Sequence, residues 1–360
     1  MKHSILSTLI MTILSIFSGN VSTNAQTQGD TFRVQGVDYK VTSGETENLA
    51  VEVNGGETAI STLTIPATVE YGGLTYSVTS IGDKAFFGSA ITSLDLTEAY
   101  NLESIGDSAF AENRSLANVQ FPSFNLSKLT IIGIHAFLHN FDLQSFNLED
   151  THIEILQSLF AKDKYDAITI SGLKELKLPV TLREIRQCAL QCLDITEIEI
   201  PSSVSTFEDY VLQGCIYLKE FIWKDAQITS LPIHTFSYIG ESLTKVVLLT
   251  VEPLEPDGLT DKHFYRIGSS APPKAVVYVT RESFAILNAN GYTNENSIYS
   301  MLVAYTEDLS DIEGITTEDK NKNNKPNIES ENIYTLQGVK VRETEPGRIY
   351  IRNGKKYIAK

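Results

Sequence analysis

The feature that most constrains how this chain can fold is a repeated motif, I-G-x-x-A-F, in which x stands for any residue. Three copies end at Phe86, Phe110 and Phe137. Later segments keep only an apolar pair five residues apart, beginning with Ile155 and Phe160. The second members of the next three pairs are Leu190, Leu212 and Phe236. Successive copies are 22 to 30 residues apart, a period that is typical of stacked repeats.

A second pattern runs in phase with this motif. Short segments alternate apolar, outward and apolar residues, as a β-strand with one buried face does. These segments are 94–96, 119–121, 146–148, 176–178, 198–200, 221–223 and 246–248. Pro122, Pro179 and Pro201 directly follow three of them, and they should end strand pairing because proline lacks the backbone N–H.

No unit of this length can bury its own apolar side, but neighbouring units cover one another when they stack. We therefore predict a repeat solenoid with a parallel β-sheet on one face and short helices or coil on the other. The strands should lie ~4.8 Å apart, and the seven motif residues from Phe86 to Phe236 should line the opposite wall. Trp223 aligns with the inward strand positions, so we expect it in the core.

The I-G-x-x-A-F segments, the strands that end in Ile-Pro and the spacing of the copies resemble the BspA-type leucine-rich-repeat proteins of bacterial surfaces. The resemblance covers residues 60–250 and is most specific in the first three copies. It implies a right-handed, leucine-rich-repeat-like solenoid, a secreted or surface-held location, and a role in adhesion or in binding host proteins. The family pattern supplies no catalytic residue.

Residues 1–25 are predicted to be a signal peptide. Lys2 precedes an apolar stretch, Ile5–Phe17, of 13 residues, which is short for the ~30 Å hydrocarbon core of a bilayer. Small residues up to Ala25 suit cleavage after that position. We therefore expect an exported protein with no membrane span after cleavage, and an uncleaved membrane anchor is the alternative.

Atypical units are expected at the two ends of a stack, where they cover apolar surface and strand edges. We predict an N-terminal β cap at residues 26–79, followed by the solenoid at 80–250. A C-terminal cap is predicted at 251–310. Residues 311–330 are rich in Asp, Glu, Lys and Asn, which predicts a linker.

Residues 331–360 are predicted to form a small β-hairpin module, in which Asn353-Gly354 is a strong turn signal. They carry 7 Lys and Arg against 3 Glu, unlike the acidic body of the chain. Their pattern is similar to the C-terminal sorting segments, type IX-like, of proteins exported through the outer membrane of certain Gram-negative bacteria. That similarity implies sorting to, or attachment at, the outer membrane. Packing on another copy or on cell-wall material is the alternative.

The sequence contains no G-x-S-x-G, no H-E-x-x-H and no phosphate-binding Gly loop. We therefore expect no enzyme activity, no cofactor and no metal. His135 and His139 are four residues apart and could share a metal if they lay on a helix. However, the slot two residues before the motif aromatic also holds Lys84, Ser108, Ser158, Cys188 and Tyr210. This variety favours ordinary, partly exposed repeat positions over a metal site.

Export would place the three cysteines in an oxidising compartment. Cys188 and Cys192 are four residues apart, so on one helical turn their Cβ atoms would be too distant for a disulfide. Cys192 and Cys215 could pair if neighbouring coils align them. We favour buried thiols, because cysteine often packs as a small apolar residue. The Cys192–Cys215 bridge remains the alternative.

The outward positions of the predicted strands are candidates for binding. One row reads Ser93, Asn118, Ser145, Glu175, Glu197, Glu220 and Lys245, and the next reads Asp95, Gln120, Asn147, Lys177, Glu199, Ile222 and Val247. The face would change from polar to acidic and then to apolar. We predict a ligand groove for a basic or mixed partner, with Ile222 as apolar anchor, at Glu175, Lys177, Glu197, Glu199, Glu220 and Ile222. The alternative is a solvated face that binds no ligand, in which nearby lysines reduce the repulsion between the carboxylates.

Acidic residues number 45 and basic residues 29, so the formal net charge is −16. The negative net charge does not favour binding to nucleic acid, because such binding requires basic residues that displace counterions. We predict a secreted or cell-surface, adhesin-like protein that binds an extracellular protein or glycan. A structural or accessory envelope component with bacterial partners only is the alternative. A hydrolase whose active module is formed by residues 251–310 is a further, weaker alternative.

Overall fold

The structure is a computed structural model. It describes residues 26–45, 47–160, 171–239, 242–264, 275–291 and 301–305, and the backbone of four short strands between residues 333 and 358. The chain divides into two compact units, residues 1–303 and 304–360, and each is described by itself. The predicted signal peptide, residues 1–25, and the predicted linker, residues 311–330, lie outside the described residues.

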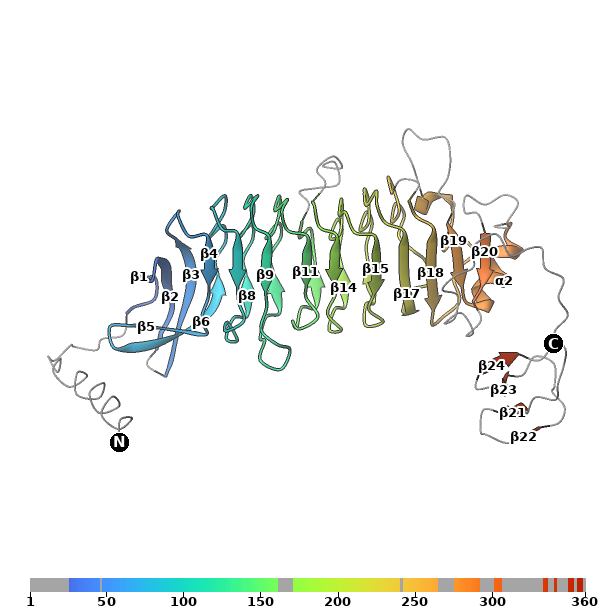
Figure 1. The fold of residues 1–360 in the computed structure, drawn as a ribbon, viewed down its shortest axis with the longest axis horizontal. Coiled ribbons are helices and arrows are strands. Elements are labelled where there is room, and N and C mark those ends of the chain that lie inside the picture. The colour runs from blue at the N-terminus through green and yellow to red at the C-terminus, as the bar shows by residue number, and fades with distance from the viewer. Residues whose placement is uncertain are drawn as a thin grey trace, which may run out of the picture. The chain divides into compact units, whose positions relative to one another are not determined.

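The first unit is a parallel β-solenoid of about nine turns (Figure 1). Each coil adds one strand to a face that we call the main sheet. Its strands are β4 (Thr62–Thr64), β7 (Ser93–Asp95), β9 (Asn118–Gln120), β11 (Ser145–Asn147), β13 (Glu175–Lys177), β15 (Glu197–Ile200), β17 (Glu220–Ala226), β18 (Lys245–Thr250), β19 (Val276–Val279) and β20 (Met301–Ala304). They form three hydrogen-bonded groups: β4-β7-β9, β11-β13 and β15-β17-β18-β19-β20. The predicted leucine-rich-repeat-like solenoid with a parallel sheet is confirmed.

A second, narrower ladder runs along another side of the coils. It contains β6 (Leu74–Ile81), β8 (Ser104–Ile105), β10 (Ile131–Ile132), β12 (Ile155–Leu156), β14 (Glu184–Ile185) and β16 (Thr206–Phe207). Its pairs are parallel, and its buried side chains include Ile81, Ile105 and Ile132, the first residues of the three motif copies. The sequence predicts short helices or irregular structure on this side. After β6, the repeating units instead have two-residue strands followed by turns. One buried residue per coil is too short a pattern to signal a strand.

The turns that carry the motif phenylalanines have an unusual backbone. Around Phe110, the residues Ser108 and Glu112 have φ of 54° and 61°, in the left-handed region that residues other than glycine avoid. The N–H groups of Ser108, Phe110 and Glu112 donate to carbonyl groups of the next coil at 2.8–2.9 Å. The turn therefore hydrogen-bonds along the stack without being a strand.

The left-handed conformation recurs at the same slot, two residues before the wall side chain of each coil. The slot is occupied by Lys84, Ser108, His135, Ser158, Cys188, Tyr210 and His234, with φ between 41° and 68°. Such a residue costs about 1–2 kcal/mol. Burying one Phe side chain contributes about 1.5–3 kcal/mol, which offsets that strain. The slot thus fixes a backbone shape rather than a side-chain chemistry, which explains its variety of residues.

The glycine of the motif has a steric cause. An added Cβ at Gly106 or Gly133 would lie 2.5 Å from the Oδ1 atom of Asp83 or Asp107 in the preceding coil. These two carboxylates accept the backbone N–H groups of Asp107 and Ile134, each at 2.8 Å. Coils that approach this closely leave no room for a side chain.

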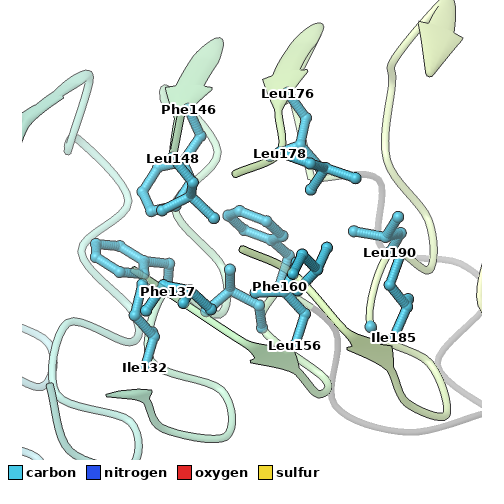
Figure 2. Close-up of a cluster of buried hydrophobic side chains, with 14 of the residues drawn as sticks. Ile132, Phe137, Phe146, Leu148, Leu156, Phe160, Leu176, Leu178, Ile185 and Leu190 are labelled. Atoms are coloured by element: carbon cyan, nitrogen blue, oxygen red, sulfur yellow. The ribbon is translucent and has the colours of Figure 1, made fainter. Parts of the chain in front are cut away.

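Aromatic rings from successive coils stack in the core. Phe86 and Phe110 are 5.6 Å apart between ring centroids, and Phe110 and Phe137 are 5.5 Å apart, both pairs nearly parallel. Figure 2 shows Phe137 and Phe160 facing the strand residue Phe146, whose ring is 4.8 Å and 5.3 Å from theirs. The structure also buries the other positions of this wall, Leu190, Leu212 and Phe236.

One apolar pair in the sequence prediction is wrong. The pattern pairs Ile155 with Phe160, but Ile155 is exposed, and Leu156 is the buried residue of β12, in register with Ile185. This coil has one residue fewer between its short strand and its left-handed residue, Ser158, than the coil before it. The deletion shortens the spacing of the inward pair from five residues to four.

Antiparallel pairs of strands lie at the N-terminal end of the first unit. They are β1 (Thr31–Val34), β2 (Val37–Glu45), β3 (Asn48–Gly56) and β5 (Thr68–Tyr71). β1, β2 and β3 pair in that order, and β3 then runs parallel to β6, which joins these strands to the narrow ladder. Phe32 stacks on Tyr71 at 4.2 Å and covers this end of the core.

Irregular elements lie towards the other end of the first unit. They are a 3₁₀ helix, η1 (Asp261–Phe264), and a helix, α2 (Arg281–Ala289). The side chain of Thr280 accepts the N–H of Ser283 at 3.3 Å and caps α2. Leu287 of α2 and Phe264 of η1 are buried in the same core as the coils.

The second unit contains four strands within the range of the predicted hairpin module. They are β21 (Ile333–Thr335), β22 (Lys340–Val341), β23 (Ile349–Arg352) and β24 (Lys355–Ile358). They pair antiparallel in the order β22-β21-β23-β24. Asn353-Gly354, the predicted turn, lies outside the described residues, between β23 and β24.

We expect Ser108→Val to lower the free energy of unfolding by about 1–3 kcal/mol, because a β-branched residue is strained at positive φ. Ser108→Gly should cost less, because glycine adopts this conformation freely. Ser104→Val is the matched control, since Ser104 lies in an extended strand that suits valine. Urea unfolding followed by circular dichroism measures all three. Equal losses for the two valine variants would contradict the role of the turn slot.

Candidate ligand groove

The outward side chains of the main sheet form two rows along the stack. The first outward row contains Ser93, Asn118, Ser145, Glu175, Glu197, Glu220 and Lys245, and the second contains Asp95, Gln120, Asn147, Lys177, Glu199, Ile222 and Val247. The register of the paired strands aligns neighbouring members of each row. The first row therefore changes from uncharged polar groups to carboxylates at Glu175, and the second ends in the apolar residues Ile222 and Val247.

A groove of about 920 Å³ opens on this face at β13, β15 and β17 and in the turns that follow them. Five of the six residues predicted to bind a ligand line it: Glu175, Lys177, Glu197, Glu199 and Ile222. The sixth, Glu220, is not part of the lining, and it accepts a hydrogen bond from Lys245 Nζ at 2.9 Å. The groove crosses the boundary between two hydrogen-bonded groups of strands, because β13 pairs with β11 and β15 pairs with β17.

Sequence reasoning missed about half of the side chains that shape the groove. They include Glu149, Lys174, Val180, Thr196, Pro201, Ser202, Ser203, Lys224 and Asp225. Most of them come from turns or from strand ends rather than from the alternating positions. The prolines that end two strands were the available signal, since the turns beside the groove begin there.

One wall of the groove is a β-bulge. β15 ends at Ile200 and Pro201 follows, whereas the neighbouring strand β17 continues to Ala226. The register between β17 and β18 shifts after Trp223, and Asp225 has φ of 53°, outside the repeating turn slots. A bulge bends its strand and redirects side chains. Asp225 and its neighbour Lys224 therefore stand exposed beside the shortened strand.

The lining carries more negative than positive charge. Its carboxylates are Glu149, Glu175, Glu197, Glu199 and Asp225, and its ammonium groups are Lys174, Lys177 and Lys224. Lys177 Nζ lies 3.7 Å from Glu149 Oε2. Glu197 and Glu199 are both exposed, and neither has an ion-pair partner among the described residues. Glu175 and Asp225 also lack an ion-pair partner among the described residues, but only Glu197 and Glu199 lie together on one strand of the groove.

Lys174 is engaged by groups outside the groove. Its Nζ donates to Gln144 Oε1 at 3.4 Å. Asp194 also interacts with it: burial raises the pKa of the Asp194 carboxyl, and the charge of Lys174 lowers that pKa in part. Lys174 therefore has a hydrogen-bond partner outside the groove.

The apolar part of the groove is smaller than the sequence predicts. Val180 is 71% exposed and Ile222 is half-buried, whereas Val247 is only 5% exposed and does not line the groove. Trp223 lies in the core, as predicted, with its ring 5.1 Å from that of Phe207. The groove thus has a packed floor and an apolar edge at Val180 and Ile222.

The two histidines considered for a metal do not lie on a helix. His135 and His139 both occupy left-handed turn positions, with φ of 60° and 59°. His139 Nδ1 is 2.6 Å from Glu112 Oε1, and this hydrogen bond, with help from Arg114, lowers the pKa of the Glu112 carboxyl. Within the described residues, no three or more His, Cys, Asp or Glu side chains are grouped to hold a metal ion.

The three cysteines are buried. The Cys215 thiol donates to the carbonyl of Leu190 at 3.1 Å, and burial raises the pKa of that thiol. Because Cys215 is a thiol, the structure does not contain the Cys192–Cys215 bridge. Cys188 and Cys192 both sit at left-handed positions of one turn.

A sequence profile described as the BspA type leucine rich repeat region matches residues 68–167 and 168–255, with six copies. These ranges amount to just over half of the chain. The chain belongs to this BspA-type family. The predicted resemblance is confirmed, and the matched ranges contain every residue of the groove.

Solved structures of other leucine-rich-repeat proteins are similar to this BspA-type chain. A leucine-rich cell surface protein from Faecalibacterium prausnitzii A2-165 is 16% identical, with a TM-score of 0.43, and the match covers 71% of this chain and 85% of that one. The T. pallidum leucine-rich repeat protein is 19% identical, with a TM-score of 0.44 and coverage of 59% and 91%. The pneumococcal vaccine antigen PcpA is 16% identical, with a TM-score of 0.32 and coverage of 78% and 100%.

No curated protein matches the sequence of this BspA-type chain. In the part of the chain that the structure describes, no helix has both the length and the apolar character required to cross a bilayer.

Glu197→Gln is expected to raise the free energy of unfolding by about 0.2–1 kcal/mol at low salt, because Glu197 lies directly beside Glu220 in the register and like charges there repel. The gain should vanish at about 1 M NaCl, where the Debye length is ~3 Å. Urea unfolding at both salt concentrations measures it. Glu70→Gln is the control, since Glu70 lies beside the uncharged Thr75. A loss of stability in Glu197→Gln would mean that the carboxylate has a stabilising partner.

Proposed function

We propose that this chain is a secreted or cell-surface, adhesin-like protein that binds an extracellular protein or glycan and catalyses no reaction. The groove on the main sheet is the observation that carries the proposal. It combines exposed carboxylates that lack internal partners with an apolar edge at Val180 and Ile222. A preformed face that carries a few charged and apolar groups suits recognition.

The composition of the groove also favours binding over chemistry. Its lining residues, all of which the structure describes, include no His and no Cys. The side chains present are carboxylates, ammonium groups, hydroxyls and aliphatic groups on strands that the coils hold in place. Such groups on a preformed surface can orient a partner with little loss of conformational entropy on the protein side.

The proposed location rests on the two ends of the sequence. Residues 1–25 have the composition of a signal peptide, and residues 331–360 resemble sorting segments of proteins exported through an outer membrane. We propose that the mature protein is exported and held at the outer membrane through residues 331–360. Membership of the BspA-type family supports this proposal, because the family resemblance implies a surface-held protein.

Val180→Asp should weaken ligand capture at least about tenfold without unfolding the protein, because Val180 is exposed in the groove and a charge there would oppose apolar contact. Leu126→Asp is the matched control: Leu126 is 55% exposed and lies outside the groove. Residues 26–360 and both variants would be incubated with host matrix and with bacterial envelope fractions, and captured molecules would be identified by mass spectrometry.

A captured molecule that Val180→Asp loses and Leu126→Asp keeps supports the groove as the binding site. Ligands found only in the envelope fraction would favour the accessory envelope component. If both variants capture the same molecules as the unchanged chain does, the groove is not the site of binding.

Deletion of residues 331–360 is expected to release the protein into the medium or strand it inside the cell, because this segment is proposed to direct outer-membrane attachment. Labelling of intact cells with a membrane-impermeant reagent, followed by fractionation, measures the surface-exposed share. Surface labelling equal to that of the full chain would contradict the proposed role of the tail.

A further inference from the structure

The charge of the groove indicates the chemistry of its partner. Five carboxylates face three ammonium groups, and one of those, Lys177, already lies beside Glu149. Lys174 donates a hydrogen bond to Gln144, which lies outside the groove. The groove therefore has a net negative charge, and two of its four unpaired carboxylates, Glu197 and Glu199, lie on one strand, β15. A positively charged group would complement it.

The spacing of these two carboxylates matches an extended chain. Glu197 and Glu199 are two residues apart on one strand, on the same face, so their Cα atoms are ~6.7 Å apart. Alternate side chains of an extended peptide have the same spacing. A partner strand aligned with β15 could therefore place two successive inward side chains against the two carboxylates.

The apolar edge lies close to these charges. In the strand register Ile222 is directly beside Glu199, and Val180 lines the same groove from the turn after β13. Val180 is the most exposed of the large apolar side chains in the described part of the chain. An apolar side chain next to a basic one on the partner would cover Val180.

The lining favours a polypeptide over a sugar. None of the lining residues, all of which are described, is aromatic, so the groove offers no flat apolar face on which a sugar ring could pack. Carboxylates, in contrast, form charge-assisted hydrogen bonds with lysine ammonium and arginine guanidinium groups. The groove volume of about 920 Å³ suits a short segment rather than a broad surface.

We infer that the groove binds an extended, basic segment of a partner protein. Lys or Arg side chains of that segment pair with Glu197 and Glu199, and an adjacent apolar side chain contacts Val180 and Ile222. The inference rests on the proposed function and narrows its partner from a protein or glycan to a basic polypeptide. Because the carboxylates are exposed, the binding should weaken as salt screens the charges.

The test uses the full mature chain, residues 26–360, and three labelled peptides. The basic peptide is Thr-Lys-Thr-Lys-Thr-Leu-Thr, and the other two replace both Lys residues by Gln or by Glu. Fluorescence anisotropy at about 0.05 M and about 0.5 M NaCl measures binding. We expect the basic peptide to bind at least about tenfold more tightly than the other two at low salt, and this preference to shrink at high salt.

Two double variants locate the preference. Glu197→Gln/Glu199→Gln should abolish it. Glu70→Gln/Glu98→Gln removes the same charge from two exposed residues outside the groove and should keep it. This comparison separates pairing in the groove from attraction to an acidic protein as a whole.

Equal binding of the basic and Gln peptides, or a preference that survives Glu197→Gln/Glu199→Gln, would overturn the inference. A captured ligand that Val180→Asp loses but Glu197→Gln/Glu199→Gln retains would also overturn it, while leaving the proposed function intact. If Val180→Asp affects no ligand, the proposed function itself fails.

Discussion

The apolar side chains of each coil leave water only by packing against the coils before and after it. Phe110 shows this, since its ring lies between those of Phe86 and Phe137, at 5.6 and 5.5 Å. Every coil must therefore advance along the stack by nearly the same distance on all its sides. Strand pairing in the main sheet and the narrow ladder meets this requirement within groups of neighbouring coils, and the motif turns add hydrogen bonds between coils.

The same requirement explains local features that look unfavourable in isolation. The left-handed turn residues are strained, but they direct alternate N–H groups along the stack and hold the wall side chains in the core. The motif glycines remove side chains at points where an aspartate of the preceding coil comes within 2.5 Å of a would-be Cβ. Close contact between coils thus determines both the backbone and the residue types of the turn.

Much of this fold could be predicted from the sequence because the pattern repeats. The alternating strands and the motif phenylalanines recur in phase, so an error in one copy does not hide the register of the others. Ile155 shows where this approach fails. A one-residue deletion places Leu156, not Ile155, in the core, and a search with a fixed spacing cannot detect that deletion. The left-handed slot was visible only as a variable position, since its residues share a backbone shape and no chemistry.

The candidate groove was predictable in part for a related reason. Alternation identified the outward row that contains Glu197, Glu199 and Ile222, because strand geometry fixes which side chains share a face. It could not identify the turn residue Val180 or the bulge residue Asp225, whose positions depend on where neighbouring strands end. It also could not show that Lys245 forms an ion pair with Glu220, which requires the side-chain positions of two coils. The ligand itself remains a proposal.

Trp223 is the only tryptophan of the chain, and it lies in β17 between two residues of the groove, Ile222 and Lys224. Its indole is fully buried, and its Nε1 has no hydrogen-bond partner within the described residues. All the indole emission of this protein therefore originates from a single coil, directly under the groove. A change in that emission reports on the packing beneath this one place, so unlabelled protein carries its own optical probe of the site.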